Sequence, residues 1–402
     1  MSVDDAVAMI AARVDAVLET ETVLLTEADG RVLAESITAP LPLPPFTNSA
    51  VDGYAVRSGD LGLVSQRAFP VTGRIAAGER ATSPIESGHA VRIFTGAPMP
   101  EGADTVFMQE DVRVEGGRVL LPAGLRAGAN VRPAGEDIAK GSEALPAGRR
   151  LRPQDVALIA ALGLTRVTVR RPIRVAVFST GDELVAPGDV RASQQLYDSN
   201  RFMLMAMLRR LGCAVGDLGI LPDDTATLAD ALKAAAHDHD LLLATGGVST
   251  GEEDHVKAAV EHVGSLVLWR MAIKPGRPVA MGVIDGTPFI GLPGNPVAGF
   301  VTFTYVVRPT VLALAGATAE RPLPVSVRAA FSYKKKISRR EYVRAHIRCG
   351  EDGVLEAVKF PREGAGLLSS LVETDGLVEL REGTTAVKPG DMVRFLSYAN
   401  LI

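Results

Sequence analysis

Apolar residues recur at helical spacing at the beginning of the chain. Ser2 and Asp5 have the spacing of a capping box, in which each side chain accepts a hydrogen bond from the other residue's backbone. The apolar residues that follow on one helical face are Val7, Ile10, Val14, Val17 and Leu18. This pattern predicts a helix within residues 1–20, and the prolines of 40–45 then exclude a helix and predict an extended connector.

Between residues 46 and 139 the apolar residues form short runs separated by glycine and proline. The runs at 91–94, 105–108 and 119–121 have the length of strands, which predicts a small, mostly β domain. Residues 140–170 contain a longer apolar run that follows Pro153, a residue that suits a helix start.

Residues 171–320 alternate between strand-like and helix-like apolar runs. The strand-like runs are 175–178, 214–218, 240–244, 266–269 and 279–284, and the helix-like runs are 202–211, 225–236 and 256–263. This alternation predicts a parallel α/β sheet with covering helices. The apolar stretch 278–307 is broken by prolines and glycines, so we expect a buried core there and no membrane span.

The last part of the chain, 321–402, contains strand-like runs and no long helical pattern. These runs are 325–330, 342–347, 354–358, 377–380 and 392–396. Glycine and aspartate turns separate them, which predicts a small β-barrel or sandwich.

Composition narrows the class of protein. The chain has 402 residues, of which 47% are hydrophobic and 22% charged, with a formal net charge of −4. That length suits roughly two to four domains, and the composition excludes a mostly disordered chain. The slight acidity argues against a nucleic-acid partner. Cys213 and Cys349 form no CxxC pair, so we expect neither a disulfide framework nor a cysteine zinc site. Acidic residues near the start exclude a signal peptide, so we expect a cytoplasmic protein.

Polar residues follow the strands predicted for the α/β segment. Glu183, Asp223 and Asp254 lie in three such loops, and the carboxyl ends of parallel strands share one edge of a sheet. Converging oxygen ligands suit Mg²⁺ better than zinc. The alternative is that each loop carboxylate caps a helix. Gly246 and Gly247 allow a close backbone approach to an oxyanion, although no Walker or GxGxxG motif surrounds them.

Cations gather in two other places. Lys274 lies beside Arg270 and Arg277, shortly before Asn295 and Pro296, which suit the N-cap and first position of a helix. A helix start beside cations favours an anion, and the alternative is a rigid turn with surface charges. The second cluster is Lys334, Lys335, Lys336, Arg339 and Arg340. It suits either a solvated loop or a phosphate contact, the latter because Arg344 lies in a strand nearby.

Seven motifs occur in an order that resembles one family. They are PPFTNSAVDGYA (44–55), TGAPMPEGAD (95–104), GEDI (135–138), STGDEL (179–184), TGGVSTGEED (245–254), KPGRP (274–278) and GLPGNP (291–296). The sequence resembles the molybdopterin molybdenumtransferases, the MoeA-like enzymes also found as the E domain of gephyrin. The resemblance covers essentially the whole chain.

The resemblance implies a multidomain α/β plus β fold. The implied parts are an N-terminal helix at 1–20 that joins the α/β domain, an elongated connecting domain at 21–45 and 140–170, an inserted β-rich domain at 46–139, an α/β molybdopterin-binding domain at 171–320 and a C-terminal β-barrel-like domain at 321–402. It also implies a cytoplasmic homodimer, with molybdopterin adenylyltransferase and molybdoenzymes as further possible partners.

The implied reaction is the Mg²⁺-dependent insertion of molybdate into adenylylated molybdopterin with release of AMP. The residues that match the family's catalytic positions are Asp52, Thr95, Asp137, Lys274, Arg270 and Arg344. The implied metal ligands are Glu183, Asp223 and Asp254. The implied substrate-binding residues are Ser179, Thr180, Gly181, Gly246, Gly247, Ser249, Pro293, Asn295 and Pro296.

The sequence departs from the family pattern at three positions. Val51 replaces a usual Met, Arg270 replaces a frequent Lys, and Ala365 lies where some relatives have a Ser. Arginine spreads its charge over a planar fork, so the geometry toward an oxyanion changes at Arg270. Two other functions fit the sequence less well. The inserted domain argues against a molybdopterin adenylyltransferase, and the sequence shows no fused adenylyltransferase domain or disordered linker of a receptor-clustering scaffold.

Overall fold

The computed structural model describes residues 1–61, 67–80, 83–247 and 255–401, with only the backbone described at residues 11 and 267–270. The chain forms two compact units. Unit 1 comprises Met1–Ala34, Gly148–Arg152 and Val167–Ile402, and unit 2 comprises Glu35–Ala147 and Pro153–Arg166. The segments of unit 2 therefore interrupt those of unit 1 along the chain.

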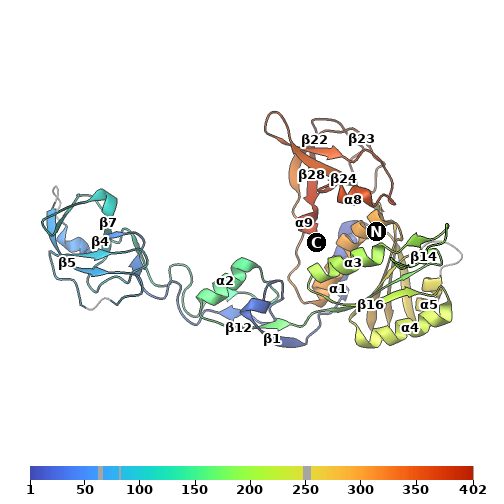
Figure 1. Ribbon diagram of the computed structural model, residues 1–402, viewed down its shortest axis with the longest axis horizontal. Helices are drawn as coiled ribbons and strands as arrows, with labels where there is room; N and C mark the ends of the chain where they lie inside the picture. Colours follow the sequence, from blue (N-terminus) through green and yellow to red (C-terminus); the bar gives the residue numbers. More distant parts are fainter. Residues whose placement is uncertain (62–66, 81–82, 248–254, 402) are drawn as a thin grey trace. The chain divides into compact units, whose positions relative to one another are not determined.

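A six-stranded sheet forms the centre of the first part of unit 1 (Figure 1). Its strands, in spatial order, are β16 (Ala214–Leu221), β13 (Arg174–Thr180), β17 (Leu241–Thr245), β21 (Thr287–Leu292), β20 (Pro278–Ile284) and β18 (Gly264–Arg270). The first four pair in parallel, whereas β20 and β18 are antiparallel to their neighbours. The predicted α/β class is confirmed, but the sheet is mixed. Asp285 and Gly286 have φ values of 48° and 88°, which suit a two-residue turn that folds β20 and β21 into a hairpin.

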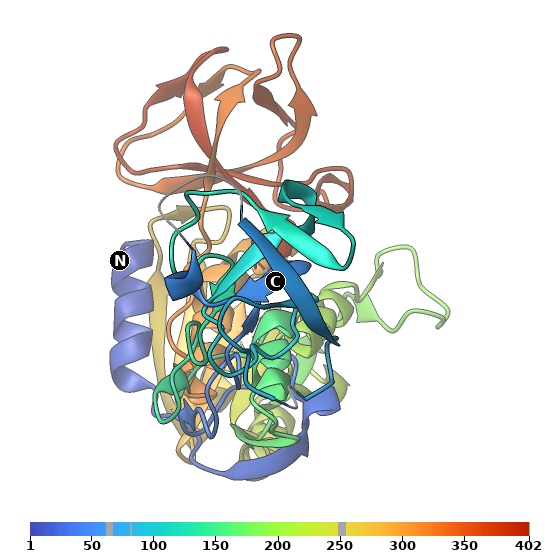
Figure 2. The ribbon, with the colours of Figure 1, turned by 90° about the vertical axis from the view of Figure 1, so that its left-hand side faces the viewer.

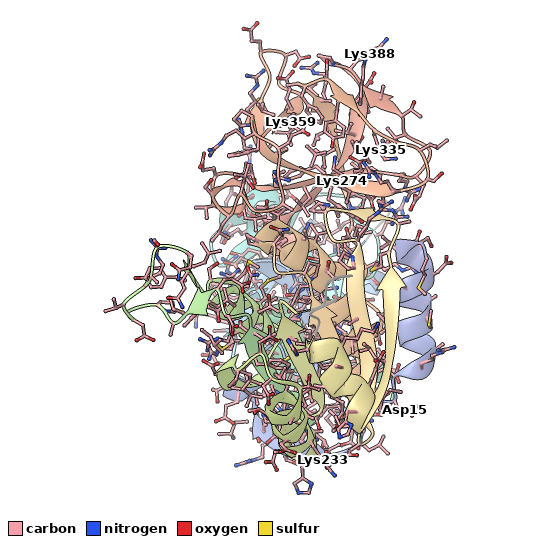
Figure 3. All side chains as sticks on the ribbon, turned by 90° about the vertical axis from the view of Figure 1, so that its right-hand side faces the viewer. Asp15, Lys233, Lys274, Lys335, Lys359 and Lys388 are labelled. Carbon is pink, nitrogen blue, oxygen red and sulfur yellow. The ribbon has the colours of Figure 1, made fainter. Side chains whose placement is uncertain are left out.

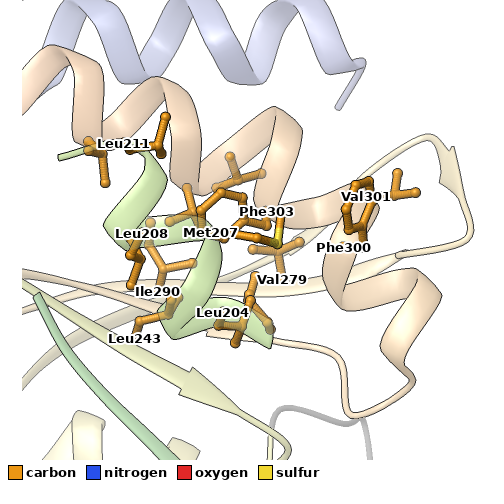
Figure 4. Close-up of a cluster of buried hydrophobic side chains, with 14 of the residues drawn as sticks. Leu204, Met207, Leu208, Leu211, Leu243, Val279, Ile290, Phe300, Val301 and Phe303 are labelled. Atoms are coloured by element: carbon orange, nitrogen blue, oxygen red, sulfur yellow. The ribbon is translucent and has the colours of Figure 1, made fainter. Parts of the chain in front are cut away.

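Helices cover both faces of this sheet. One face packs against α1 (Val3–Arg13), α3 (Asn200–Arg210) and the consecutive segments α6 (Pro296–Thr302), η4 (Phe303–Val307) and α7 (Arg308–Leu314). The other face packs against α4 (Thr225–Asp238) and α5 (His255–Val263). Side chains alternate along a strand, so Val175 and Val177 of β13 join the first core while Ala176 and Phe178 join the second. Figure 4 shows the first core, where α3 residues meet residues of the sheet and of α6.

The helix ends agree only partly with the sequence pattern. The capping box of α1 is confirmed, with the Asp5 backbone N–H donating to Ser2 Oγ over 3.1 Å. The helix ends at Arg13, so Val14 and Val17 lie beyond it, and the buried residues of its inner face are Val3, Ala6 and Ile10.

The helical segment Pro296–Leu314 is long and apolar enough, by length and composition, to cross a membrane. Within the fold, however, 89% of its apolar window is buried. The core expected for 278–307 is therefore confirmed, because this helix is covered by protein.

The second part of unit 1 is a closed five-stranded barrel, which confirms the predicted β-barrel (Figure 2). Its strands are β24 (Arg340–Cys349), β25 (Leu355–Lys359), β22 (Val325–Ala329), β28 (Met392–Ser397) and β26 (Gly376–Leu380), which pairs with β24 and closes the barrel. The two-residue strand β19 (Ile273–Lys274) pairs with β24 in parallel. This pairing joins the barrel to the α/β part, since β19 lies shortly before β20 in the sequence.

Unit 2 contains a second six-stranded sheet. Its strands, in spatial order, are β7 (Thr105–Met108), β4 (Gly53–Val56), β6 (Ala90–Ile93), β5 (Arg67–Ile75), β9 (Arg118–Leu121) and β8 (Arg113–Glu115). The β-rich character expected for this segment is present, and α2 (Pro153–Ala161) begins at the expected proline. The five domain boundaries drawn from the sequence stay a prediction.

Short ribbons, two short α-helices and the three-residue 3-10 helices η1 (Leu25–Glu27), η2 (Ser58–Asp60) and η3 (Gln109–Asp111) complete the described part of the chain. The ribbons pair β1 (Thr20–Leu24) with β12 (Arg166–Arg170), β2 (Ile37–Thr38) with β11 (Glu143–Leu145), β3 (Asn48–Ser49) with β10 (Val131–Arg132), β14 (Leu184–Val185) with β15 (Leu196–Tyr197), and β23 (Tyr333–Lys334) with β27 (Ala386–Val387). The short α-helices are α8 (Ser369–Val372) and α9 (Tyr398–Leu401).

Candidate functional site

A pocket of about 340 Å³ lies within unit 1 where the α/β part meets the barrel. Its lining residues come from β19, the turn after it, the start of α6, the strand β24 and the loop after β25. Figure 3 labels Lys274 at the base of the barrel, with Lys359 in the barrel above it. The β19–β24 pairing therefore places residues far apart in the sequence around one cavity.

The lining of this pocket is strongly cationic. Its positively charged side chains are Lys274, Arg277, Arg339, Arg344, Lys359 and Arg362. Among the described residues that line it, Glu363 is the one carboxylate, and its Oε1 lies 3.3 Å from the Lys359 ammonium. Lys274 and Arg339 pair with the buried Glu341 behind the pocket, and the cationic charge in excess of these two carboxylates favours an anionic ligand.

Lys274 is held by side chains of the barrel. Its ammonium donates to Tyr333 Oη over 3.1 Å and to Glu341 Oε2 over 3.3 Å. Burial alone would lower the pKa of Lys274, but the bond to Tyr333 and the charge of Glu341 outweigh burial and raise the pKa above its ordinary value. Lys274 is therefore a cation at every physiological pH.

Arg344 of β24 also lines the pocket and is held by two hydrogen bonds. Its Nε donates to Ser370 Oγ over 3.0 Å and one terminal nitrogen donates to the Gly364 carbonyl over 3.1 Å. Burial lowers the pKa of Arg344, yet a guanidinium stays charged in a protein. These two bonds hold the guanidinium in one orientation, as a preformed anion site requires.

The floor of the pocket requires a glycine. Gly276 has a φ of 113°, and a Cβ built there would lie 2.5 Å from Thr302 Oγ1. The Thr302 hydroxyl is fully buried and has no hydrogen-bond partner. The KPGRP motif thus supplies the cation Lys274, and its glycine is explained by the lack of space for a side chain.

The backbone at the start of α6 offers fewer free N–H groups to an anion than the sequence suggests. Asn295 is the N-cap and Pro296 the first helical residue, as expected. The Asn295 side chain makes no capping bond, and both Asn295 and Pro293 line the pocket. However, Pro296 has no N–H, and the Val297 N–H donates to the Ala365 carbonyl over 3.0 Å. The groups that remain available to an anion are therefore the side-chain cations, because the Ala365 carbonyl occupies the Val297 N–H.

The carboxyl ends of β13, β16, β17 and β21 meet at one edge of the sheet, as the sequence predicts. Thr180 Oγ1 donates to Asp223 Oδ1 over 3.2 Å. Asn200 Nδ2 donates to both Thr245 Oγ1 and the Gly294 carbonyl, over 3.1 and 2.7 Å. We call this edge the strand rim. It brings together residues of three expected motifs.

Glycines let the loops of the strand rim pack closely. A Cβ on Gly246 would lie 2.8 Å from the Thr180 carbonyl, and one on Gly247 would lie 2.5 Å from a Val256 methyl. Gly181 has a φ of 136°, and the Glu183 carboxylate lies over it, 2.5 Å from where a Cβ would be. Only glycine fits at these three positions without displacing a neighbour.

The expected metal ligands are partly described. Asp223 is half-buried and Glu183 exposed at the strand rim, whereas Asp254 and Ser249 lie outside the described residues. Among residues 1–61, 67–80, 83–247 and 255–401, no three His, Cys, Asp or Glu side chains gather as metal ligands. The capping alternative does not apply to Asp223, because the N-cap of α4 is the neighbouring Asp224, whose side chain accepts from the Thr227 N–H over 2.9 Å.

Two further expected residues need separate mention. Ser179 lies at the end of β13 with its hydroxyl fully buried and without a hydrogen-bond partner. The backbone of Arg270 pairs with Pro278, and its side chain is outside the described part of the chain. The role of Arg270 toward an oxyanion therefore stays a prediction.

Unit 2 brings Asp52 and Thr95 together. Thr95 donates its backbone N–H and its hydroxyl to the same atom, Asp52 Oδ1, over 2.8 and 2.7 Å. These bonds lower the pKa of Asp52, and the guanidinium of Arg92 adds to the effect. Arg92 itself stacks over the Tyr54 ring at 4.9 Å. The exposed carboxylate is thus ionised and held in one orientation.

Asp137 is exposed on the same unit, in the turn that follows β10. Its backbone N–H donates to the Leu43 carbonyl over 3.0 Å. Within the described contacts, its carboxylate has no bond to Asp52 or Thr95. The structure therefore brings together two of the three residues expected on the inserted domain.

The side chains of the basic cluster at 334–340 fall into three groups: Lys334 and Lys336 are exposed, Arg339 lines the pocket, and Lys335 and Arg340 are buried. Lys335 is buried, and its ammonium donates to three backbone carbonyls, those of Lys336, Glu382 and Thr384. Arg340 is buried among carboxylates of α1 and the barrel. The solvated-loop interpretation is wrong for these two residues, and Arg339 is the member of the cluster that lines the pocket.

Sequence reasoning missed Tyr333, Glu341, Lys359 and Arg362. Tyr333 and Glu341 contact Lys274 only because β19 pairs with β24 and places Lys274 opposite Glu341. No local motif marks these residues. The one available signal was the cationic run around residue 339, which lies directly before Glu341.

Comparisons with known proteins agree along the whole chain. Residues 1–163 match the family model of the MoeA N-terminal region (domain I and II), residues 176–313 match the probable molybdopterin binding domain, and residues 326–398 match the MoeA C-terminal region (domain IV). Three matched segments in order cover most of the chain.

Individual relatives agree with these matches. The chain is 39% identical over 386 residues to a molybdopterin molybdenumtransferase of Haemophilus influenzae, covering 96% of this chain and 95% of that protein. It is 34% identical over 393 residues to one from Nostoc sp., covering 96% and 90%. A crystal structure of a molybdopterin biosynthesis moeA protein from Pyrococcus horikoshii OT3 has a TM-score of 0.82 and 29% identity, covering 99% of this chain and all of that one.

Proposed function

Because the chain belongs to the MoeA family of molybdopterin molybdenumtransferases, we propose that it inserts molybdate into adenylylated molybdopterin and that the cationic pocket of unit 1 binds the molybdate. Membership in this family makes the protein a transferase of molybdenum cofactor biosynthesis. Beyond this membership, we propose the cationic pocket as the molybdate site, Mg²⁺ as the metal and AMP as the released product.

The observation that supports the molybdate site is the charge of the pocket. Six cations line it against one carboxylate. Unit charges 4 Å apart attract by about 4 kcal/mol at the effective dielectric of a protein surface, and a dianion by about twice that. Lys274 and Arg344 each donate two hydrogen bonds, which fix the orientation of their charged groups. They would bind the oxyanion from two sides without a large loss of side-chain entropy.

The strand rim supports a site for the adenylylated end of the substrate. Gly247 has no side chain of its own, which favours close approach of a phosphate to the backbone, whereas the Gly246 N–H already donates to the Leu292 carbonyl over 3.2 Å. Glu183 and Asp223, with the Thr180 hydroxyl, supply the hard oxygen donors that Mg²⁺ prefers. When bound, Mg²⁺ would neutralise charge on the phosphoanhydride and favour release of AMP. We assign Asp254 to the same metal as a prediction from the family motif.

The resemblance also supports proposals about assembly. We propose a homodimer, in which Asp52, Thr95 and Asp137 of the inserted domain serve catalysis, and a cytoplasmic location. A molybdopterin adenylyltransferase and molybdoenzymes are the proposed partners that supply the substrate and receive the product. Sedimentation of the purified chain tests the dimer, and a monomer under all concentrations would contradict it.

The test of the proposed function has two measurements. The purified protein, given adenylylated molybdopterin, molybdate and Mg²⁺, should release AMP, and Asp223→Ala should reduce that release strongly. Calorimetry should detect molybdate binding to the wild type and weaker binding to Arg344→Ala. Absence of AMP release with a folded protein would refute the enzyme function and favour a scaffold. AMP release without any molybdate binding to the pocket would refute the proposed site alone.

A further inference from the structure

One buried carboxylate lies behind the cations of the pocket. Glu341 is 1% exposed. Its Oε2 accepts from Lys274 Nζ over 3.3 Å and from Tyr333 Oη over 2.7 Å, and its Oε1 accepts from Arg339 Nε over 2.7 Å. Both oxygens are therefore committed to residues that line the pocket.

We propose that Glu341 and Tyr333 are positioning residues that hold the Lys274 ammonium ready for a tetrahedral oxyanion, an inference that rests on the proposed function. Neither residue belongs to a motif of the sequence. Their arrangement follows from the register of β19 on β24, which places Lys274 directly opposite Glu341.

Lys274 needs such support for a physical reason. A lysine side chain is a flexible stem of four carbons, and it loses considerable rotamer entropy when it is held in one conformation. Here the ammonium donates to two acceptors, and the Tyr333 ring lies under it at 5.7 Å. The side chain stays partly exposed, so the ammonium is restrained by the barrel while it remains accessible from the pocket. Restraint before binding lowers the entropic cost of binding.

Glu341 has a second effect, on the charge of the pocket. Lys274 and Arg339 both contact its carboxylate, so the negative charge lies between two like charges that would otherwise repel. Burial would raise the pKa of Glu341, but the bonds from Tyr333 and Arg339 outweigh burial and hold the pKa below its ordinary value. The carboxylate is therefore ionised and offsets part of the cationic charge without contacting the anion.

The experiment compares three variants in the complete protein. Glu341→Gln keeps the shape of the side chain and removes its charge. Tyr333→Phe keeps the ring under Lys274 and removes the hydroxyl. Glu356→Gln is the matched control, because Glu356 also pairs with two arginines of the barrel, Arg328 and Arg348, and lies outside the cationic pocket.

The expected result is a selective loss of molybdate affinity. For Glu341→Gln we expect the KM for molybdate and its calorimetric Kd to rise about tenfold, with kcat and the KM for adenylylated molybdopterin changed less than about twofold. For Tyr333→Phe we expect a smaller rise, about threefold, because one of the two bonds to Lys274 remains. Glu356→Gln should leave both KM values and kcat at the wild-type level.

Other outcomes would overturn the inference. An unchanged molybdate KM in Glu341→Gln and Tyr333→Phe would mean that Lys274 needs no support. An equal loss in Glu356→Gln, or a parallel change of both KM values, would indicate barrel stability instead of positioning. Should Glu341→Gln fail to fold, Tyr333→Phe decides by itself. Failure of the proposed function is separate, because wild-type protein would then release no AMP, and failure of the proposed site would appear as wild-type protein that binds no molybdate in calorimetry.

Discussion

Gly276 provides a direct test of how the pocket floor is built. Replacing it by alanine places a Cβ 2.5 Å from Thr302 Oγ1 and 3.3 Å from the Ala298 carbonyl, at a φ of 113°. A non-glycine residue in such a conformation costs about 1–3 kcal/mol. Overpacking against a buried, β-branched side chain adds about 1–3 kcal/mol. We therefore expect Gly276→Ala to destabilise unit 1 by roughly 2–6 kcal/mol.

A second glycine separates the two contributions. Gly390 has a φ of 96° and nothing within 4 Å of a built Cβ, so Gly390→Ala should show the conformational cost alone. Both variants are compared with the wild type by calorimetric unfolding, and molybdate affinity is measured for Gly276→Ala, where we expect at least a tenfold loss. When Gly276→Ala is made in a protein that also carries Thr302→Ala, most of the packing cost should disappear, because the hydroxyl that the new Cβ would meet is then absent.

One result would refute this reasoning about Gly276. If Gly276→Ala is no less stable than Gly390→Ala, and Thr302→Ala gives no relief, the pocket floor adjusts freely and steric contact does not explain the glycine of the KPGRP motif.

Three further predictions concern other parts of unit 1. Asp224→Ala removes the side-chain cap of α4 and should cost about 1 kcal/mol in denaturant unfolding; no loss would show that the cap is dispensable. Burial raises the pKa of Cys213 to about 12, whereas Cys349 is exposed, so a thiol reagent at pH 8 should label Cys349 alone, and rapid labelling of both would contradict the fold. Burial would raise the pKa of Asp240, but bonds from Arg171 outweigh it and hold the pKa below 3.8. Its contribution to stability is thus present above pH 3.8 and is lost as the pH falls through the lower folded value, so acid unfolding of Asp240→Asn should be less steep than that of the wild type.

Much of the fold could be predicted from local pattern. The cap of α1, the helix start at Pro153 and the strand lengths of the barrel follow from residue spacing, because capping and alternation act over a few residues. The mixed sheet was missed although Asp285-Gly286 is a strong hairpin signal. The alternation of strands and helices in this segment predicts a parallel sheet, but alternation alone does not specify the direction of each strand.

The candidate site divides in the same way. The loops of the strand rim were expected to converge, since parallel strands share their carboxyl ends, and Thr180 and Asp223 do meet there. The buried role of Arg340 was not expected, because a run of cations suggests solvent unless its partners are known. Those partners come from α1 and from other strands of the barrel.

The amino-acid sequence by itself determined the motifs, the family and the chemical types of group available: carboxylates after strands, cations around a turn, and glycines where backbone must approach closely. Only the tertiary structure decided which of these groups act together. Lys274 pairs with Glu341 because two strands 67 residues apart along the chain lie side by side. Asp224 caps α4 and its neighbour Asp223 does not, because the helix begins directly after Asp224. Hydrogen bonds and charge interactions act over a few ångströms, so the fold alone decides which partners come within that range.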